Sequence, residues 1–248
     1  MNRTPFQGIS NIIRFNPIMF IVAGVAIVLG VIGVIVTSGW LSIAICLCLL
    51  GSIVSLTLSL AASYWIYDGS SIYDLTFLDD SEDSEQNFWV NINAGFDEIS
   101  RSIEMRFPET KLHILDFYDP EKHTEASIAR ARNAYPPHPD TVTIQSDALP
   151  IENATANKVI AFFSLHEIRD HGERVQALKE IHRKLKDEGK LYLTEHLRDV
   201  PNLIVYSFGA FHFHTRKEWL AAFNESGFKI KMAEKTTPFV TTFTLIKA

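Results

Sequence analysis

The stretch Lys158-Val159-Ile160-Ala161-Phe162-Phe163-Ser164 is almost entirely apolar, as is typical of a central strand that is covered on both faces of its sheet. Residues 173–185 follow with apolar side chains at helical spacing, and residues 190–195 form a second apolar stretch. A strand, a helix and a strand in this order predict a parallel pair with a right-handed crossover. The centre of the chain is therefore predicted to be an α/β fold.

The same alternation continues toward the N-terminus of this unit. Strands are predicted at residues 88–92, 111–115 and 141–145, and a helix at residues 98–107. Asp119-Pro120-Glu121 combines a capping acceptor with proline at a first helical position. It predicts a helix from there to about Ala134.

Toward the C-terminus, Thr215-Arg216-Lys217-Glu218 has the spacing of a capping box and predicts a helix that stops at Gly227. Two further strands, residues 228–235 and 239–247, are joined by a short turn. Residues 88–248 are thus predicted to form a doubly wound, seven-stranded, mostly parallel sheet.

Two apolar runs, Ile18 to Val36 and Leu41 to Ile66, precede this domain. Each reaches the roughly 20 residues that cross a hydrocarbon core. Because lipid offers no hydrogen-bond partners to the backbone, each run is predicted to be a helix. The four residues between them predict an antiparallel hairpin. We therefore divide the chain into a tail and transmembrane hairpin (residues 1–66), a juxtamembrane linker or lid (residues 67–87) and the α/β domain.

Two details of the hairpin carry further expectations. Arg3 and Arg14 precede it, and positive flanks favour the cytoplasmic side, which would leave the domain in the cytoplasm as well. Gly51, Ser55 and Ser59 form a small-residue stripe on which the first helix is expected to pack closely, unless the stripe is ordinary transmembrane composition.

Composition limits the partners. The net charge of −6 argues against nucleic acid, whose binding requires clustered lysine and arginine. Cys46 and Cys48, two apart on one predicted helix, indicate neither a disulfide framework nor a zinc site. The expected partners are the lipid bilayer and a hydrophobic small molecule.

Three stretches of the domain resemble the class I S-adenosylmethionine-dependent methyltransferases. Ser146-Asp147-Ala148-Leu149-Pro150 is similar to the family's acidic loop, residues 159–168 to its fourth strand and turn, and residues 177–191 to its following helix, turn and fifth strand. The resemblance runs from about Tyr67 to the C-terminus. It implies a sheet whose last strand is antiparallel, and S-adenosylmethionine as cofactor.

The resemblance also implies cofactor contacts. In the glycine loop only Gly95 remains, with Asn93 as a replacement that tolerates positive φ. Asp116 would bind the ribose hydroxyls, and Asp147 and Leu149 the adenine; the alternatives are a strand-end turn residue and a solvated loop. The full predicted set is Asn93, Ala94, Gly95, Asp116, Phe117, Asp147, Ala148, Leu149 and Ser164.

Histidines follow the fourth and fifth predicted strands, at the edge where ligands bind in open parallel sheets: His166-Glu167, Glu195-His196 and His212-Phe213-His214. A metal would need three or four such groups to converge. The simpler expectation is partly exposed polar loop residues and no metal site. His166 and His196 are candidate general bases, because imidazole titrates near neutral pH.

The connection from Arg198 to His214 is unusually apolar for a loop. We expect it, with the segment from Tyr67 to Tyr73, to wall an acceptor pocket that opens toward the bilayer. A short helix packed over the sheet is the alternative. The residues predicted to contact the acceptor are Tyr67, Tyr73, Phe208, Phe211 and His214.

These observations predict a membrane-anchored, S-adenosylmethionine-dependent methyltransferase that acts on a small or lipid-soluble acceptor at the cytoplasmic membrane face. The altered glycine loop supports an alternative, a non-catalytic scaffold or sensor that keeps the fold. A nicotinamide-dependent dehydrogenase is less favoured, because the dinucleotide-binding glycine fingerprint is absent. Fold alone does not decide between these functions.

Overall fold

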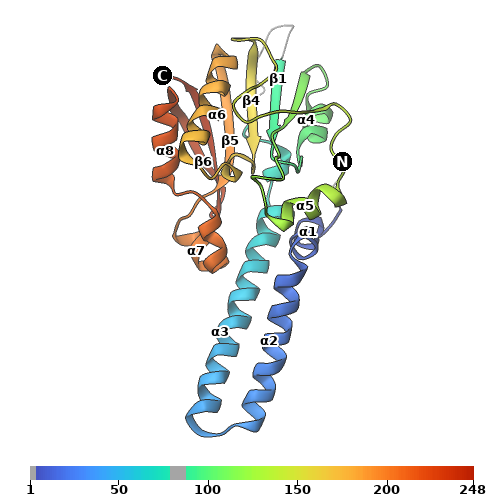
Figure 1. Ribbon diagram of the computed structural model, residues 1–248, viewed down its shortest axis with the longest axis vertical. Coiled ribbons are helices and arrows are strands. Elements are labelled where there is room, and N and C mark those ends of the chain that lie inside the picture. The colour runs from blue at the N-terminus through green and yellow to red at the C-terminus, as the bar shows by residue number, and fades with distance from the viewer. Residues whose placement is uncertain (1–3, 79–87) are drawn as a thin grey trace.

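The computed structural model describes residues 4–78 and 88–248 and divides the protein into a long helical hairpin and an α/β domain (Figure 1). The hairpin projects from one end of the domain, and the C-terminus lies at the opposite end. Residues 79–87 of the predicted linker lie outside the described residues.

The hairpin consists of α2 (Pro17–Val36) and α3 (Gly39–Tyr64). Both are long and apolar enough to cross a membrane by length and composition. Each contains an apolar stretch of 18 residues in which no residue is buried. At about 1.5 Å per residue, α2 is about 30 Å long, the thickness of a hydrocarbon core. The predicted antiparallel hairpin is confirmed.

The two helices approach each other through glycines of α2, and the predicted role of the small-residue stripe on α3 is wrong. A Cβ atom on Gly30 would lie 2.4 Å from a methyl carbon of Leu49, whereas one on Gly51 would meet nothing within 4 Å. Ser55 Oγ lies 3.3 Å from Ser207 Oγ of the domain. The close approach of the two helices is therefore made at Gly30 of α2, whereas Ser55 of the stripe contacts the domain.

A helix that the sequence did not predict, α1 (Gln7–Phe15), lies across the junction between hairpin and domain. Its first free amides, those of Gly8 and Ile9, donate to the Asp68 carboxylate at 2.7 and 2.9 Å. The carbonyl of its last residue accepts from Arg130 Nη1 at 2.6 Å. These contacts fasten both ends of α1 to the segments around the sheet edge.

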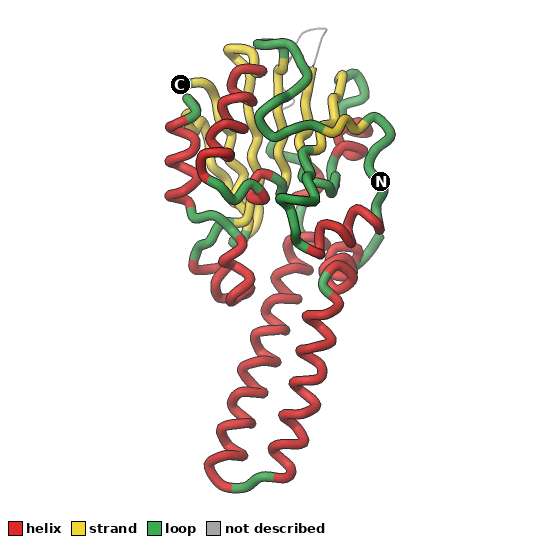
Figure 2. The backbone as a smooth tube through the Cα atoms, in the orientation of Figure 1, coloured by secondary structure: helices red, strands yellow, loops and turns green. Residues whose placement is uncertain are grey.

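Seven strands form one sheet in the order β3-β2-β1-β4-β5-β7-β6 (Figure 2). The strands β1 to β5 pair in parallel, and β7 is antiparallel to both of its neighbours. This confirms the predicted sheet and its antiparallel last strand. The bounds are β1 (Phe88–Asn93), β2 (Lys111–Asp116), β3 (Thr141–Thr143), β4 (Ala156–Phe162), β5 (Leu185–His196), β6 (Phe228–Thr237) and β7 (Val240–Lys247).

Alternate residues of β4 supply two separate cores, as the two-residue period of a strand requires. Val159 and Ala161 pack with the apolar sides of α6 (His171–Lys184) and α8 (Arg216–Glu225) on one face. Ile160 packs on the other face with α4 (Ser100–Arg106), and with the short helices η1 (Trp65–Gly69) and η2 (Ile72–Asp74) that follow the hairpin. The segment after the hairpin is therefore part of the domain core.

Several predicted helix bounds differ from the structure. The capping box of Thr215 and Glu218 is present and begins α8 as expected. The helix predicted from Asp119 is wrong in its first turns, because α5 begins only at Ala126 (Ala126–Ala134). Asp119 instead closes a turn: its carbonyl accepts from the amide of His123 at 2.7 Å.

The remaining short helices lie at the carboxyl ends of the strands. They are η3 (Leu165–Glu167), α7 (Val200–Tyr206) and η4 (Ser207–His212). The connection predicted as an apolar loop is thus helical, as in the stated alternative, but it descends beside α3 instead of covering the sheet (Figure 1).

Candidate active site

A cavity of about 420 Å³ lies where the hairpin meets the carboxyl edge of the sheet. Its walls come from α1, the hairpin, α5 and the sheet edge. Met19 and Ser59 belong to the hairpin, Phe15 to α1, and Ile128 to α5. The sheet edge and the segment after it contribute Ala94, Phe163, His166, His196, Tyr206 and His212.

The end of β1 forms the turn expected to approach the cofactor. Gly95 has φ of +92°, a conformation that glycine adopts without strain. The Asn93 side-chain oxygen accepts from the Gly95 amide at 3.1 Å. The Asn93 Nδ2 atom is buried and has no hydrogen-bond partner among the described residues. A buried donor without an acceptor carries a desolvation cost, which a bound acceptor would relieve.

Asp116 ends β2 directly beside Asn93, its partner in the parallel register. Its carboxylate is buried and accepts from the Tyr118 amide at 2.9 Å and from Arg132 Nη1. The Arg132 guanidinium also lies 4.6 Å from the centroid of the Tyr118 ring. Arg132, 28% exposed, therefore covers the carboxylate predicted to bind the ribose.

The other predicted cofactor residues lie away from this cavity, and Ala94 alone of the nine lines it. Asp147 and Ala148 are exposed, while the buried Leu149 donates its amide to Glu180 Oε1 at 3.1 Å. Phe117 is buried against the ring of His123. Ser164 Oγ donates to the Ile92 carbonyl at 2.8 Å and joins the ends of β4 and β1.

His196, at the end of β5, is buried and faces the cavity through Tyr67. Its Nδ1 lies 3.0 Å from the Phe239 carbonyl, which can only accept, so Nδ1 carries the proton. Its Nε2 therefore accepts from the Tyr67 hydroxyl at 2.8 Å. Burial lowers the pKa of His196 to about 4, so the ring is neutral at pH 7 and is able to accept a proton.

His166 is also buried, but its surroundings are acidic. Its Nδ1 lies 2.6 Å from Glu195 Oε2 and its Nε2 lies 3.1 Å from Glu167 Oε1. Burial alone would lower the pKa of His166, but the charge of Glu195 and the hydrogen bonds with both carboxylates outweigh it and raise the pKa to about 10. The pKa of Glu167 is lowered, since its bonds to His166 and His212 outweigh its burial.

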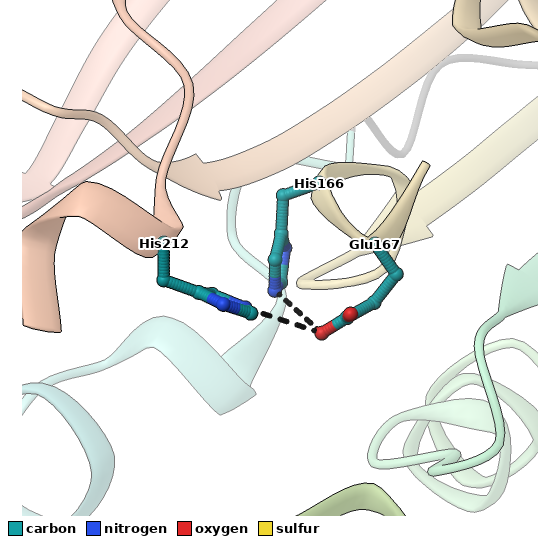
Figure 3. A group of neighbouring side chains, drawn as sticks. All are labelled: His166, Glu167 and His212. Atoms are coloured by element: carbon teal, nitrogen blue, oxygen red, sulfur yellow. Dashed lines mark ion pairs between the residues drawn. The ribbon is translucent and has the colours of Figure 1, made fainter. Parts of the chain in front are cut away.

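His166, Glu167 and His212 converge at the cavity wall (Figure 3). Figure 3 shows the two rings, from η3 and from η4, both directed at the Glu167 carboxylate. His166 is buried, whereas Glu167 and His212 are partly exposed as expected, and the three residues converge, which the sequence did not indicate. The strand-end positions of the His-Glu and His-Phe-His motifs were the available signal, but their convergence depends on how η4 packs.

The predicted acceptor residues divide into two sets. Tyr67 and Tyr73 line the cavity, and the Tyr73 hydroxyl donates to Glu98 Oε2, which also lines it. Phe208 and Phe211 do not: they are 89% and 59% exposed, because η4 turns them outward. His214 is buried on the other side of the domain, where its Nε2 accepts from Arg174 Nη1 at 3.0 Å. The prediction that these three wall the pocket is wrong.

Residues 119–193 match the family described as "Methyltransferase domain". Together with the sheet order, this match decides the class. The chain contains a class I S-adenosylmethionine-dependent methyltransferase domain. The cofactor of such a domain is S-adenosylmethionine.

The methyltransferase domain is also similar to solved structures at low identity. A methyltransferase from Aquifex aeolicus is 11% identical, with 66% of this chain and 84% of that chain covered and a TM-score of 0.46. The mitomycin 7-O-methyltransferase MmcR is 16% identical, with 84% and 57% covered and a TM-score of 0.49. The geranyl diphosphate C-methyltransferase of Streptomyces coelicolor is 12% identical, with 68% and 75% covered and a TM-score of 0.49. No curated protein matches the chain.

The residues at the ends of β1 and β2 fit the cofactor. Its ribose needs a carboxylate, which Asp116 would supply, and its amino-acid group needs one donor and one acceptor. The partnerless Asn93 Nδ2 is such a donor, and Glu98 presents carboxylate oxygens at the cavity wall. Arg132 must leave Asp116 for the ribose to bind, which its long and partly exposed side chain permits.

Proposed function

We propose that the protein is a membrane-anchored methyltransferase that methylates a hydrophobic, lipid-soluble acceptor at the cytoplasmic face of the membrane. One observation carries the proposal: the cavity at the catalytic edge of the sheet is built from both the domain and the hairpin. An acceptor dissolved in the bilayer would reach the sheet edge along the helices that anchor the domain.

The acceptor class follows from where the cavity walls come from. Met19 of α2 and Ser59 and Ser63 of α3 line it, so its hairpin side lies against the end of the apolar spans. The side of the domain carries aromatic rings, including Phe163, Tyr206 and Phe213. The apolar parts of these walls favour an apolar molecule, because they bury apolar surface, and the histidines and carboxylates of the sheet edge would face a polar end of that molecule.

The region around η4 supports contact with the bilayer. Ser207 lies against Ser55, nine positions before the end of α3, which is about 14 Å down that helix. Beside it, Val200, Ile204, Phe208 and Phe211 are all more than half exposed. Apolar side chains exposed next to an apolar helical hairpin are typical of a segment that dips into the membrane interface.

The arginine content of the N-terminal flank sets the proposed orientation. Arg14 is the last basic residue before α2, and Arg3 lies outside the described residues. Because the hairpin returns to the side from which it started, the domain lies on the same side as these arginines, which favours the cytoplasm.

When bound, S-adenosylmethionine supplies an activated methyl group on sulfur, so positioning accounts for much of the rate. Tyr67 and His196 are the groups placed to accept a proton from an acceptor hydroxyl. The Tyr67 oxygen would take that proton while its own passes to His196 Nε2, which already accepts its hydrogen bond at 2.8 Å. Tyr67 thereby connects the cavity with a buried, neutral imidazole.

Methyl transfer into a lipid fraction tests the proposal. The full chain in vesicles of its host's lipid extract would be incubated with S-adenosylmethionine carrying a tritiated methyl group. We expect organic-extractable label, and a loss of about a hundredfold in Tyr67→Phe or His196→Gln if these residues move the proton. His171→Ala, an exposed histidine paired with Glu225 outside the cavity, is the control.

A second candidate function remains, since Arg132 covers Asp116. Cofactor binding without any transfer of label, in vesicles that contain the extracted acceptor pool, would favour a non-catalytic scaffold or sensor at the membrane.

A further inference from the structure

Three potential ligand atoms meet at one point on the cavity wall. Glu167 Oε1 lies 3.1 Å from His166 Nε2 and 3.4 Å from His212 Nε2, and the three atoms lie within 4.8 Å of one another (Figure 3). Metal bonds to imidazole and carboxylate are about 2.0–2.2 Å long, so atoms around one ion are separated by roughly 3–4 Å. The two separations from Glu167 Oε1 already fall in this range, and the two imidazoles, within 4.8 Å of each other, would close around an ion.

Each imidazole is also held from behind by a second carboxylate. His166 Nδ1 lies 2.6 Å from Glu195 Oε2, and His212 Nδ1 lies 2.6 Å from Glu125 Oε1. Histidines that bind metals usually donate the other ring nitrogen to an outer carboxylate or carbonyl, which fixes the tautomer and the ring orientation. Here both rings are arranged to present Nε2 to the same point.

The negative charge around this point favours the binding of a cation. Three carboxylates, those of Glu125, Glu167 and Glu195, surround the two rings. Arg169 lies close to them, with Nη2 2.8 Å from His212 Nε2. Its side chain is 42% exposed, so it can move outward and leave the place to a smaller, doubly charged ion.

We propose that His166, Glu167 and His212 bind a divalent transition metal of the zinc class. Two imidazole nitrogens and one carboxylate oxygen suit zinc, cobalt or ferrous iron, whereas calcium and magnesium prefer all-oxygen sites. All three residues line the cavity, so the metal's remaining positions face the space assigned to the acceptor. The acceptor would then carry an oxygen that coordinates there, a hydroxyl or enol; this last step rests on the proposed function.

Metal binding can be measured without cofactor or acceptor. The full chain in detergent, freed of any histidine tag and stripped with a chelator, would be titrated with cobalt chloride and followed by visible absorption. Zinc chloride would then be added as competitor. We expect one cobalt per chain, displaced by zinc, with the absorption of a four- or five-coordinate site.

Variants test whether the metal binds to these residues. Glu125→Gln removes an outer carboxylate and is expected to weaken metal binding by roughly ten- to a hundredfold. His212→Ala removes a ligand and is expected to weaken it further. His171→Ala is the matched control, since His171 pairs with Glu225 away from the cavity, and it should bind cobalt as the wild type does.

The proposal is overturned if wild type, His212→Ala and Glu125→Gln bind cobalt equally, or if the wild type binds none. Circular dichroism of each variant separates loss of a ligand from loss of fold, and Glu125→Gln, at a 42% exposed side chain, keeps the test valid if His212→Ala is unstable. Because cofactor is absent, the result stands whether or not methyl transfer is later observed.

Discussion

Arg132 of α5 forms an ion pair with Asp116 at the end of β2, over the glycine turn that ends β1. A Cβ atom on Gly95 would lie 3.0 Å from Arg132 Cδ, so the arginine side chain occupies the space directly above that turn. In the proposed function this space belongs to the cofactor. Binding must therefore exchange one partner of Asp116, a guanidinium, for another, the ribose hydroxyls.

Removing the guanidinium should strengthen cofactor binding. The pair is partly exposed, and such pairs contribute about 0.5–1 kcal/mol, so Arg132→Ala is expected to tighten S-adenosylmethionine binding by roughly two- to fivefold. Arg101→Ala, on the exposed side of α4, should leave the affinity unchanged. Weaker binding by Arg132→Ala would show instead that the arginine contacts the cofactor, and calorimetry distinguishes the two results.

The buried His196 predicts an acid limb in the stability of the fold. Its pKa is about 4 in the folded protein against 6.5 when unperturbed, so the unfolded chain binds a proton first as the pH falls. The contribution of neutral His196 is complete above pH 6.5 and is lost as the pH falls toward 4. Its magnitude is up to about 3 kcal/mol. Tyr67, His166 and Asp199 are the titratable groups that act on this ring.

Denaturant unfolding between pH 7 and pH 4 checks this limb. His196→Gln should lose less stability over that interval than the wild type, although it is less stable at pH 7. His171→Gln is a suitable control, because His171 is an exposed histidine that pairs with Glu225 outside the cavity. Equal slopes for wild type and His196→Gln would contradict the assignment of a neutral, buried ring.

The exposed phenylalanines of η4 predict that this helix reaches the acyl chains of the bilayer. Phe208→Trp should be quenched by brominated acyl chains, because its side chain is 89% exposed and lies beside α3. Met232→Trp, on the edge strand β6 at 43% exposure, provides the reference for an exposed tryptophan on the α/β domain. The additional quenching over wild type should be confined to position 208. The same quenching at both positions would place η4 outside the bilayer.

Much of the fold was predictable because its signals are local. The apolar length of Ile18 to Val36 and the short connection after it specify a hairpin, and the alternation of strands and helices specifies the sheet. The Thr215 capping box gave a correct helix start for the same reason. Asp119-Pro120 failed because the same residues also form a tight turn, which His123 completes.

The site was less predictable because it is made by contacts between distant parts of the chain. Nothing near Gly95 indicates that Arg132 covers it, and nothing near His166 indicates that His212 joins it across 46 positions. The helix α1 was missed for a related reason: it is held at the junction by Asp68 and Arg130, residues far from it in sequence. Only the strand-end positions of the histidines pointed to this edge.

Calorimetric titration of the full chain in nanodiscs measures whether the domain binds S-adenosylmethionine at the ends of β1 and β2. We predict saturable binding of one cofactor per chain. Asp116→Ala should weaken it at least about tenfold, since a hydrogen bond to a charged acceptor contributes about 1.5–3 kcal/mol. No heat of binding to wild type at millimolar cofactor, or equal affinity in Asp116→Ala, would contradict it.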